Sequence, residues 1–242
     1  KIISNMSTLV AMWTRISRGY DPIPPSKNMS YAENFMYMCF GEKADDEIVK
    51  LLDACLILHA EHTINASTFS TMVTASTLSN PFSSIAAGVG TLAGPLHGNA
   101  NENVLVMLDE IGSPKNARSW IEDRLKNKKV IWGMGHREYK TKDPRATILE
   151  QMIKTYVNKT GHNLSERFET ALEVESICDE LLSHKGVYPN VDFYSGILYA
   201  ELFKFTKEHF TSIFAMARSA GWVAHWHEQV SHNKIFRPTQ IY

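Results

Sequence analysis

Almost no segment of the 242-residue chain alternates apolar and polar residues over the length of a β-strand, whereas apolar residues recur at helical spacing through most of it. Residues that begin and end helices separate these segments. Asp143-Pro144 and Ser113-Pro114 precede two of them, and Gly161 follows another. The pattern predicts an all-α fold.

The first, second and last apolar segments predict helices over residues 1–18, 30–40 and 210–230. Small residues in the segment that begins at Asn80-Pro81 predict a helix that crosses its neighbours closely. Residues 233–242 read as an extended tail. The chain starts at Lys1 with neither an initiator Met nor a signal-peptide layout, as if a helix were entered in its middle. We therefore expect an N-terminal portion of the protein to precede it.

Composition narrows the function classes. The net charge is −1, from 25 Lys and Arg against 26 Asp and Glu, and this balance argues against nucleic acid as a partner. No apolar run approaches the ~20 residues of a membrane span. Three widely spaced cysteines, Cys39, Cys55 and Cys178, read as buried thiols in a reducing compartment. A chain of this length forms one large or two modest domains.

The first stretch that could carry chemistry is Gly94-Pro95-Leu96-His97-Gly98-Asn99-Ala100-Asn101-Glu102. It is short and polar, and it lies between two long apolar segments. A histidine between a rigid Pro-Leu pair and a glycine is held in one place. Taken alone, the stretch fits an interhelical turn with a surface histidine as well as it fits a functional loop.

The second stretch runs from Gly133 to Arg145 and contains His136 between glycines and lysines. Two glycines let the backbone approach a ligand closely. An arginine in the first turn of a helix is unfavourable for the helix dipole, so we expect something anionic to offset the charge of Arg145. A glycine turn with a solvated basic face is the alternative.

The third stretch, residues 188–196, places Asp192 between two apolar residues. Burial raises the pKa of such a carboxylate and a nearby cation lowers it again, which is how a carboxylate becomes a competent base. An ordinary helix N-cap is the alternative. Arg218, in an apolar helix, needs a partner, and Arg237 lies in the tail. Both suit carboxylate binding, with a structural ion pair as the alternative.

The remaining histidines do not predict a metal site. His59 and His62 are three residues apart, not the four of the zincin motif, and His225 and His227 lie on different faces of a helix. No third ligand is evident, so we expect no metal.

Five ordered motifs carry a family resemblance over nearly the whole chain, from about residue 50 to the end. They lie at residues 94–102, 133–145, 188–196, 214–225 and 233–238. In this order they resemble citrate synthase, and the short prokaryotic-type enzymes more than the longer animal-type ones. The resemblance implies an almost entirely helical homodimer with a large domain (residues 1–96 and 206–242) and a small domain (residues 97–205) that close over the substrates.

The resemblance also implies a reaction, in which acetyl-CoA, oxaloacetate and water give citrate and CoA through an enol(ate) and citryl-CoA. This is an acyltransferase step of the tricarboxylic acid cycle. His97 would hold the thioester carbonyl, Asp192 would remove the methyl proton, and His136 would polarise the oxaloacetate carbonyl. A thioester α-proton is weakly acidic, so a base and an oxyanion donor must act together.

Binding roles follow from the same resemblance. The substrate carboxylates would be bound by His62, Arg145, Arg218 and, from the partner subunit, Arg237. Coenzyme A, a co-substrate and not a tightly bound cofactor, would lie against Ile131, Gly133, Met134 and Gly135, with Lys140 at a phosphate.

One departure is visible, because position 99 is Asn where the family commonly has Gly. Two other readings stay open: a 2-methylcitrate synthase that uses propionyl-CoA, and an inactive fragment with a structural or binding role. The expected location is the cytoplasm, or the mitochondrial matrix in a eukaryote.

Overall fold

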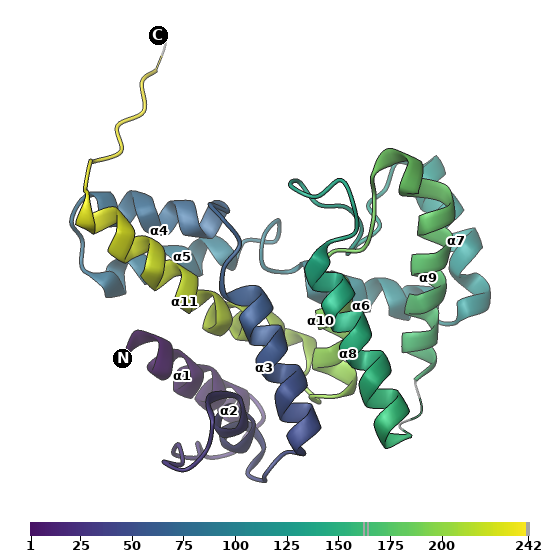
Figure 1. The fold of residues 1–242 in the computed structure, drawn as a ribbon, viewed down its shortest axis with the longest axis horizontal. Helices are drawn as coiled ribbons and strands as arrows, with labels where there is room; N and C mark the ends of the chain where they lie inside the picture. The colour runs from purple at the N-terminus through teal and green to yellow at the C-terminus, as the bar shows by residue number, and fades with distance from the viewer. Residues whose placement is uncertain (162, 164, 241–242) are drawn as a thin grey trace. The chain divides into compact units, whose positions relative to one another are not determined.

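The computed structural model describes residues 1–161, 163 and 165–240, and within these residues it contains helices and no sheet. An isolated antiparallel bridge joins Met134 and Pro189. The predicted all-α class is therefore confirmed. The α-helices labelled in Figure 1 are α1 (Ile2–Ile16), α2 (Tyr31–Phe40), α3 (Asp46–Ala60), α4 (Ala66–Ser76), α5 (Pro81–Leu92), α6 (Ala100–Ile111), α7 (Pro114–Lys126), α8 (Pro144–Thr160), α9 (Glu166–Leu182), α10 (Val191–Glu201) and α11 (Phe210–Ser231), with 3₁₀ turns at Ser183–Lys185 and Lys207–His209.

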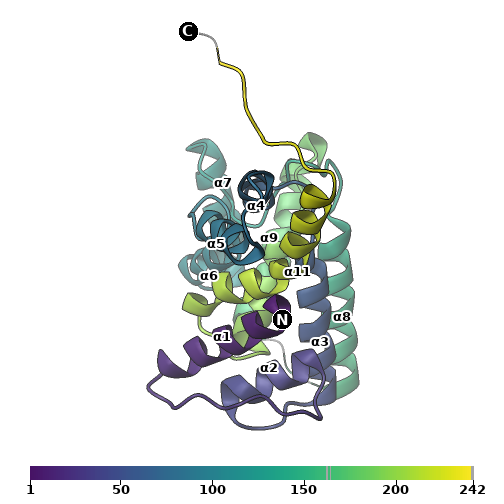
Figure 2. The same ribbon diagram turned by 90° about the vertical axis from the view of Figure 1, so that its left-hand side faces the viewer.

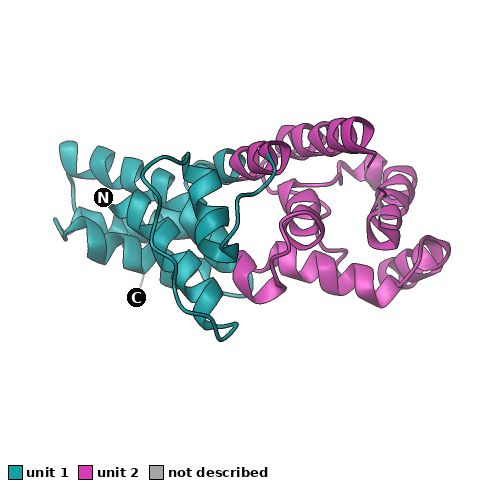
Figure 3. Ribbon diagram, turned by 90° about the horizontal axis from the view of Figure 1, so that it is seen from below, with its two compact units in different colours: residues 1–45, 56–98, 211–242 teal, residues 46–55, 99–210 magenta. Residues whose placement is uncertain are grey.

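The chain divides into two compact units, coloured separately in Figure 3. Unit 1 comprises Lys1–Asp45, Leu56–Gly98 and Thr211–Tyr242, and unit 2 comprises Asp46–Cys55 and Asn99–Phe210. Helix α3 contributes its first part to unit 2 and its second part to unit 1. Each unit is described separately below.

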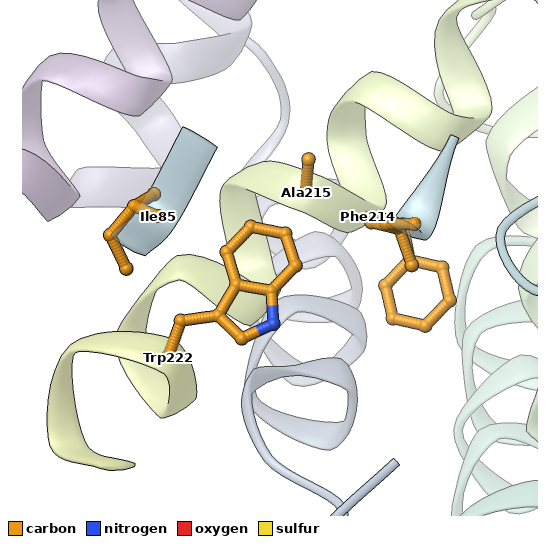
Figure 4. Close-up of a cluster of buried hydrophobic side chains, with 5 residues drawn as sticks. Ile85, Phe214, Ala215 and Trp222 are labelled. Atoms are coloured by element: carbon orange, nitrogen blue, oxygen red, sulfur yellow. The ribbon is translucent and has the colours of Figure 1, made fainter. Parts of the chain in front are cut away.

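Unit 1 is built around α5 and α11. Its core cluster of Ile85, Leu92, Phe214, Ala215 and Trp222 is drawn in part in Figure 4. A Cβ atom on Gly88 would lie 2.5 Å from Thr71 Oγ1 and 3.1 Å from the Trp222 indole. Only glycine allows α5 to approach α4 and α11 this closely, so the predicted close helix crossing is confirmed. Beyond α11, residues 233–240 form an extended tail (Figures 1 and 2).

Unit 2 is centred on α10, where Phe193, Tyr194 and Tyr199 are completely buried. A Cβ atom on Gly196 would lie 2.5 Å from the Asn101 carbonyl oxygen, which shows how closely α10 crosses α6. Together with α8 and α9, these helices fix the ends of the loops that carry the candidate site residues of this unit.

Local signals set most helix ends. Asp143 and Ser165 accept hydrogen bonds from the first turns of α8 and α9, and Gly161 ends α8 in the left-handed conformation, all as predicted. The predicted cap at Ser113 is wrong in one respect, since its side chain makes no capping hydrogen bond. Pro114 still begins α7. The three cysteines are buried and free, which confirms that they are buried thiols.

Candidate active site

The candidate site residues fall into two groups, one in each unit. In unit 1, His97 lies in the turn after α5, where its backbone N–H donates to the Gly94 carbonyl at 2.9 Å. The following residue must be glycine, because a Cβ atom on Gly98 would lie 2.3 Å from the Leu92 carbonyl oxygen. Thr211 Oγ1 donates to the Gly98 carbonyl at 3.1 Å and ties the turn to α11. The histidine is therefore held in place, as the sequence indicated.

The ring of His97 is oriented by the first turn of α4. Asn65 caps this helix by accepting from Thr68 N–H at 3.2 Å. The backbone N–H of Ser67, in the same turn of α4, donates to His97 Nε2 at 3.3 Å. The hydroxyl oxygen of Ser67 lies 2.9 Å from the same nitrogen. Because Nε2 accepts a backbone hydrogen bond, the proton of the neutral ring belongs on Nδ1. The turn thus presents an N–H donor.

Sequence reasoning missed Ser67. The stretch around it reads as small residues suited to packing, and only the position of Asn65 before α4 hinted at a helix N-terminus. Trp222 Nε1 of α11 also donates to Ser67 Oγ, at 3.2 Å. A serine that contacts both a histidine and a tryptophan far along the chain has no local signature.

Arg218 lies in the buried middle of α11 and is 2% exposed. Its Nε donates to the His59 carbonyl at 2.7 Å, and its guanidinium lies 4.9 Å from the centroid of the Phe214 ring. The His97 ring centroid is 6.4 Å from the same ring centroid. Phe214 therefore brings Arg218 and His97 to one neighbourhood within unit 1.

His62 and Arg237 are placed differently. His62 follows the end of α3 and is half-buried, and its carbonyl accepts from Asn65 Nδ2 at 3.4 Å. Arg237 is exposed in the tail. The residue before it, Phe236, donates its N–H to Ser76 Oγ at 3.2 Å and contacts the Phe69 ring.

In unit 2, the loop that bears His136 is fastened to the segment before α10. Gly135 N–H donates to the Tyr188 carbonyl at 2.7 Å, and Asn190 N–H donates to the Gly133 carbonyl at 2.9 Å. The side-chain amide of Asn190 donates to the Gly135 carbonyl at 2.9 Å. Gly133 has φ +78°, and its Cβ would lie 2.8 Å from Phe193, so glycine is required there.

His136 is a neutral ring in a defined tautomer. Its Nδ1 accepts from the Glu138 backbone N–H at 3.1 Å, which places the proton on Nε2. Burial and then the Arg145 guanidinium lower the pKa of His136 below its ordinary 6.5, although Asp143 and Asp192 act in the opposite direction. The ring packs against the Tyr139 ring in a tilted arrangement, with centroids 4.9 Å apart. A neutral ring with its proton on Nε2 can donate a hydrogen bond to a carbonyl oxygen.

Asp143 does more than cap α8. Its carboxylate is 1% exposed and accepts from Arg145 Nε at 3.1 Å, from the second guanidinium nitrogen at 2.8 Å and from Arg145 N–H at 2.9 Å. It also accepts from Val191 N–H at 3.1 Å, at the start of α10. Burial alone would raise the pKa of Asp143, but Arg145 holds it below its usual value.

The anionic group expected to offset Arg145 is thus present in the same chain, because the Asp143 carboxylate provides that negative charge. The side chain of Arg145 is not completely buried, because 11% of it remains exposed. The Tyr139 ring lies 6.0 Å from its guanidinium carbon.

Asp192 is the second residue of α10 and is half-buried. The N-cap of this helix is Asn190, whose side chain accepts from Asp192 N–H at 3.0 Å. The N-cap alternative for Asp192 is therefore wrong. Its charge raises the pKa of His136, which places the two side chains in one electrostatic environment within unit 2.

The residues expected to line a coenzyme A site differ in exposure. Ile131 and Gly133 are buried, Met134 and Gly135 are half-buried, and Lys140 is exposed. The backbone at Lys140 packs on Gly186, whose Cβ would lie 3.1 Å from the Lys140 carbonyl oxygen. Asn99, the departure noted above, has φ −101° at the N-cap of α6, so its backbone does not require glycine.

Within the described ranges, no group of three or more His, Cys, Asp or Glu side chains is placed to hold a metal ion. A separate property concerns membranes: none of the described helices combines the length and apolar character needed to cross one.

Comparison with known proteins identifies the family of this chain. The family described as citrate synthase, C-terminal domain, matches residues 1–239. Citrate synthase of Acidithiobacillus ferridurans is 53% identical over all 242 residues, and that of Synechocystis sp. is 52% identical. The chain spans 62% and 60% of the length of these two relatives.

Solved structures agree. The crystal structure of citrate synthase from Pyrobaculum aerophilum matches 100% of this chain and 60% of its own, with a TM-score of 0.92 and 41% identity. Citrate synthase from Thermoplasma acidophilum, solved as a ternary complex with carboxymethyl coenzyme A and oxaloacetate, matches 99% of this chain and 64% of its own, with a TM-score of 0.91 and 36% identity. The sequence motifs, the helical fold and these similarities together show that the chain belongs to the citrate synthase family.

Proposed function

We propose that the protein condenses acetyl-CoA with oxaloacetate and water to give citrate and CoA, as an acyltransferase that converts the acyl group to alkyl on transfer. The observation that carries the proposal is the pair of histidines with assigned tautomers. His97 offers Nδ1–H and His136 offers Nε2–H, each because the other ring nitrogen accepts a backbone hydrogen bond. A reaction that develops charge on two carbonyl oxygens needs two such donors.

Asp192 acts as the base. Its carboxylate removes a proton from the methyl group of acetyl-CoA, while His97 Nδ1–H donates to the thioester carbonyl and stabilises the enol(ate). Asp192 lies in the first turn of α10, directly after the segment that is fastened to the His136 loop.

His136 polarises the oxaloacetate carbonyl through Nε2–H. The enol(ate) carbon of acetyl-CoA then attacks the carbonyl carbon of oxaloacetate to form citryl-CoA. Hydrolysis of the thioester then releases citrate and CoA. Arg145, Arg218 and His62 bind the carboxylates of oxaloacetate and citrate. Asp143 holds the Arg145 guanidinium in one orientation, so that its remaining N–H groups are aimed without further ordering.

Coenzyme A binds as a co-substrate against residues 131–135, with Lys140 at a phosphate. Met134 and Gly135 are half-buried, and glycine allows a ligand to approach the backbone closely. The proposal includes a large domain of residues 1–96 and 206–242 and a small domain of residues 97–205. The expected location is the cytoplasm, or the mitochondrial matrix in a eukaryote, with a role in the tricarboxylic acid cycle.

The protein works as a homodimer, and Arg237 binds a carboxylate in the partner's site. The exposure of Arg237 in the extended tail supports this role. The test mixes an inactive Arg237→Ala subunit with an inactive Asp192→Asn subunit. Verified heterodimers should regain partial activity, and heterodimers without activity would assign Arg237 to its own subunit.

The main test measures free thiol released from acetyl-CoA by the purified full-length gene product. Release should require oxaloacetate. Thiol at the same rate without oxaloacetate, or none at all, contradicts the proposal, and the second result fits a structural or binding role. The same assay with propionyl-CoA serves as a specificity arm, because faster release from it would assign a 2-methylcitrate synthase.

A further inference from the structure

One charged cluster in unit 2 lies outside the candidate site and touches three of the elements that carry it. Glu175 of α9 accepts from Tyr194 of α10 through one carboxylate oxygen and from Lys142 through the other. Lys142 Nζ also donates to Glu150 of α8 at 2.6 Å. The Lys142 ammonium lies 5.7 Å from the centroid of the Tyr194 ring.

Three members of this cluster are largely protected from solvent, whereas the Lys142 side chain is 28% exposed. Tyr194 is completely buried, and the side chains of Glu150 and Glu175 are each 16% exposed. Exposed ion pairs contribute little, but a buried hydroxyl that loses its acceptor carries a desolvation cost. The bond between Tyr194 and Glu175 is therefore of the kind that fixes a helix.

The protonation states favour the same arrangement. Burial and then the Glu175 carboxylate raise the pKa of Tyr194 far above its ordinary 10.0, so its hydroxyl stays a donor. Burial acts against charge on Lys142 and Glu150, but their hydrogen-bonded partners prevail, raising the pKa of Lys142 and lowering that of Glu150. All three groups keep these states at neutral pH.

Each arm of the cluster ends next to a proposed site residue. Lys142 directly precedes Asp143, which orients Arg145, and it closes the loop that bears His136. Tyr194 lies two residues after Asp192 on the first turns of α10. A shift at either arm changes the position of a group that must be placed accurately, and a misplacement of about 1 Å can cost about a hundredfold in rate.

We infer that Glu175 is a positioning residue for the reaction, which joins Tyr194 and Lys142 and thereby sets the places of Asp192 and of the His136 loop. The inference rests on the proposed function for its catalytic consequence. The arrangement of the three side chains stands without it.

The experiment compares Tyr194→Phe and Glu175→Gln with a matched control, Glu180→Gln. Tyr194→Phe keeps the ring and removes only the donor, so the variant keeps the shape of the core. Glu180 lies on the same helix and pairs with Arg118 of α7 at the surface, away from the site-bearing segments. Each variant is assayed for thiol release, normalised to folded protein by near-ultraviolet circular dichroism.

We expect kcat to fall about tenfold in Tyr194→Phe and Glu175→Gln, with the KM for acetyl-CoA changed less than about twofold. Glu180→Gln should keep kcat within about twofold. A double variant should lose about as much as Glu175→Gln alone, because that change already weakens the Tyr194 bond as well as the Lys142 bond. If kcat per folded protein is unchanged while the melting temperature drops, the cluster is merely structural and the inference is overturned.

Hydrogen exchange of peptides covering residues 133–145 and 188–193 tests the anchoring without catalysis. The inference is supported if these peptides exchange faster in Tyr194→Phe than in the unmodified protein, while Glu180→Gln leaves the exchange rate unchanged. Equal exchange rates in the two variants overturn it. If the unmodified protein releases no thiol with oxaloacetate, the proposed function fails, whereas the exchange result still decides whether Glu175 anchors these segments.

Discussion

The two candidate histidines are held by opposite means. His97 of unit 1 takes its orientation from Ser67, thirty positions away in sequence, and shares the Phe214 neighbourhood with Arg218, whose own partner His59 is 159 positions away. In unit 2, His136 takes its tautomer from Glu138, two residues on. The orientation of His97 depends on tertiary packing, whereas the tautomer of His136 is set by a neighbouring residue. Distant residues, Tyr188 and Asn190, hold only the loop that bears His136.

This difference predicts which contacts a substitution near each histidine will alter. A change near His97 alters contacts among α4, α5 and α11, which form the core of unit 1. A change in the His136 loop acts on a local hydrogen-bond pattern and on the Asp143–Arg145 pair. The variants below either break one arrangement or measure how much it contributes.

The largest effect is expected for Asp192→Asn, which keeps the shape of the side chain and removes the base. Turnover should fall by about a thousandfold or more, since general base catalysis contributes roughly 10²–10⁴. Oxaloacetate binding, measured by calorimetry, should survive. If binding and turnover are lost together, Asp192 holds substrate or structure instead.

The next effect concerns Asp143→Asn. The amide cannot accept the three Arg145 bonds and the Val191 bond as a carboxylate does, and a buried charge loses its partner. The KM for oxaloacetate should rise at least about tenfold, and the free energy of unfolding should fall by about 3 kcal/mol. Steady-state kinetics and urea titration check both values.

Asp109→Asn is the control for this variant, because Asp109 pairs with Arg167 at the surface of the same unit. It should cost no more than about 1 kcal/mol. An equal loss in both variants would mean that Asp143 has no special role in orienting Arg145.

A smaller effect is expected for Ser67→Ala. The variant removes the hydroxyl contact to His97 but keeps the backbone N–H that sets the tautomer. The value of kcat should fall only about threefold to tenfold, in keeping with the loss of one hydrogen bond. Ser70→Ala, on the same helix, is the control. A loss as large as that of Asp192→Asn would show that the hydroxyl holds the ring.

The smallest effect within the working range is the response to pH. Because the pKa of His136 lies below 6.5 in the folded protein, the folded state binds its proton less readily than the unfolded state. Its contribution to stability is complete above pH 6.5 and is lost as the pH falls through the lowered pKa. Donation from the neutral ring should follow the same direction.

The measurement is a nitrogen NMR titration of His136 beside a profile of kcat/KM between about pH 5 and 9. The rate should stay level above pH 6.5 as far as His136 is concerned, with the proton on Nε2. A ring that titrates above 6.5, or one protonated on Nδ1 when neutral, contradicts the local arrangement described for this histidine.

Much of the fold could be predicted because helix ends are local events. Asp143, Pro144 and Gly161 frame α8, and Ser165 begins α9, each through contacts within a few residues. The glycine-containing loop and its histidine could also be predicted, because they depend on residues close in sequence. Small residues such as Gly88 also predict that two helices cross closely, but they do not indicate which helices these are.

The rest of the candidate site could not be read in this way. Ser67 matters because α4 begins beside the turn after α5, and nothing near Ser67 in sequence says so. The position of Arg145 indicated an anionic partner, but not that the partner would be the buried Asp143 of its own chain. The roles of the site residues and the domain boundaries remain predictions.

The tail that bears Arg237 also determines the entropic cost of the carboxylate binding proposed for this residue. Asn233 Nδ2 and Phe236 N–H both bond to Ser76, so the chain is secured up to the residue before Arg237. A free tail would lose about 1–2 kcal/mol of conformational entropy per ordered residue on binding. Here a carboxylate that meets Arg237 has only one side chain to immobilise. The tether thus acts as preorganisation, converting a flexible chain end into a short arm with a high effective concentration near its anchor.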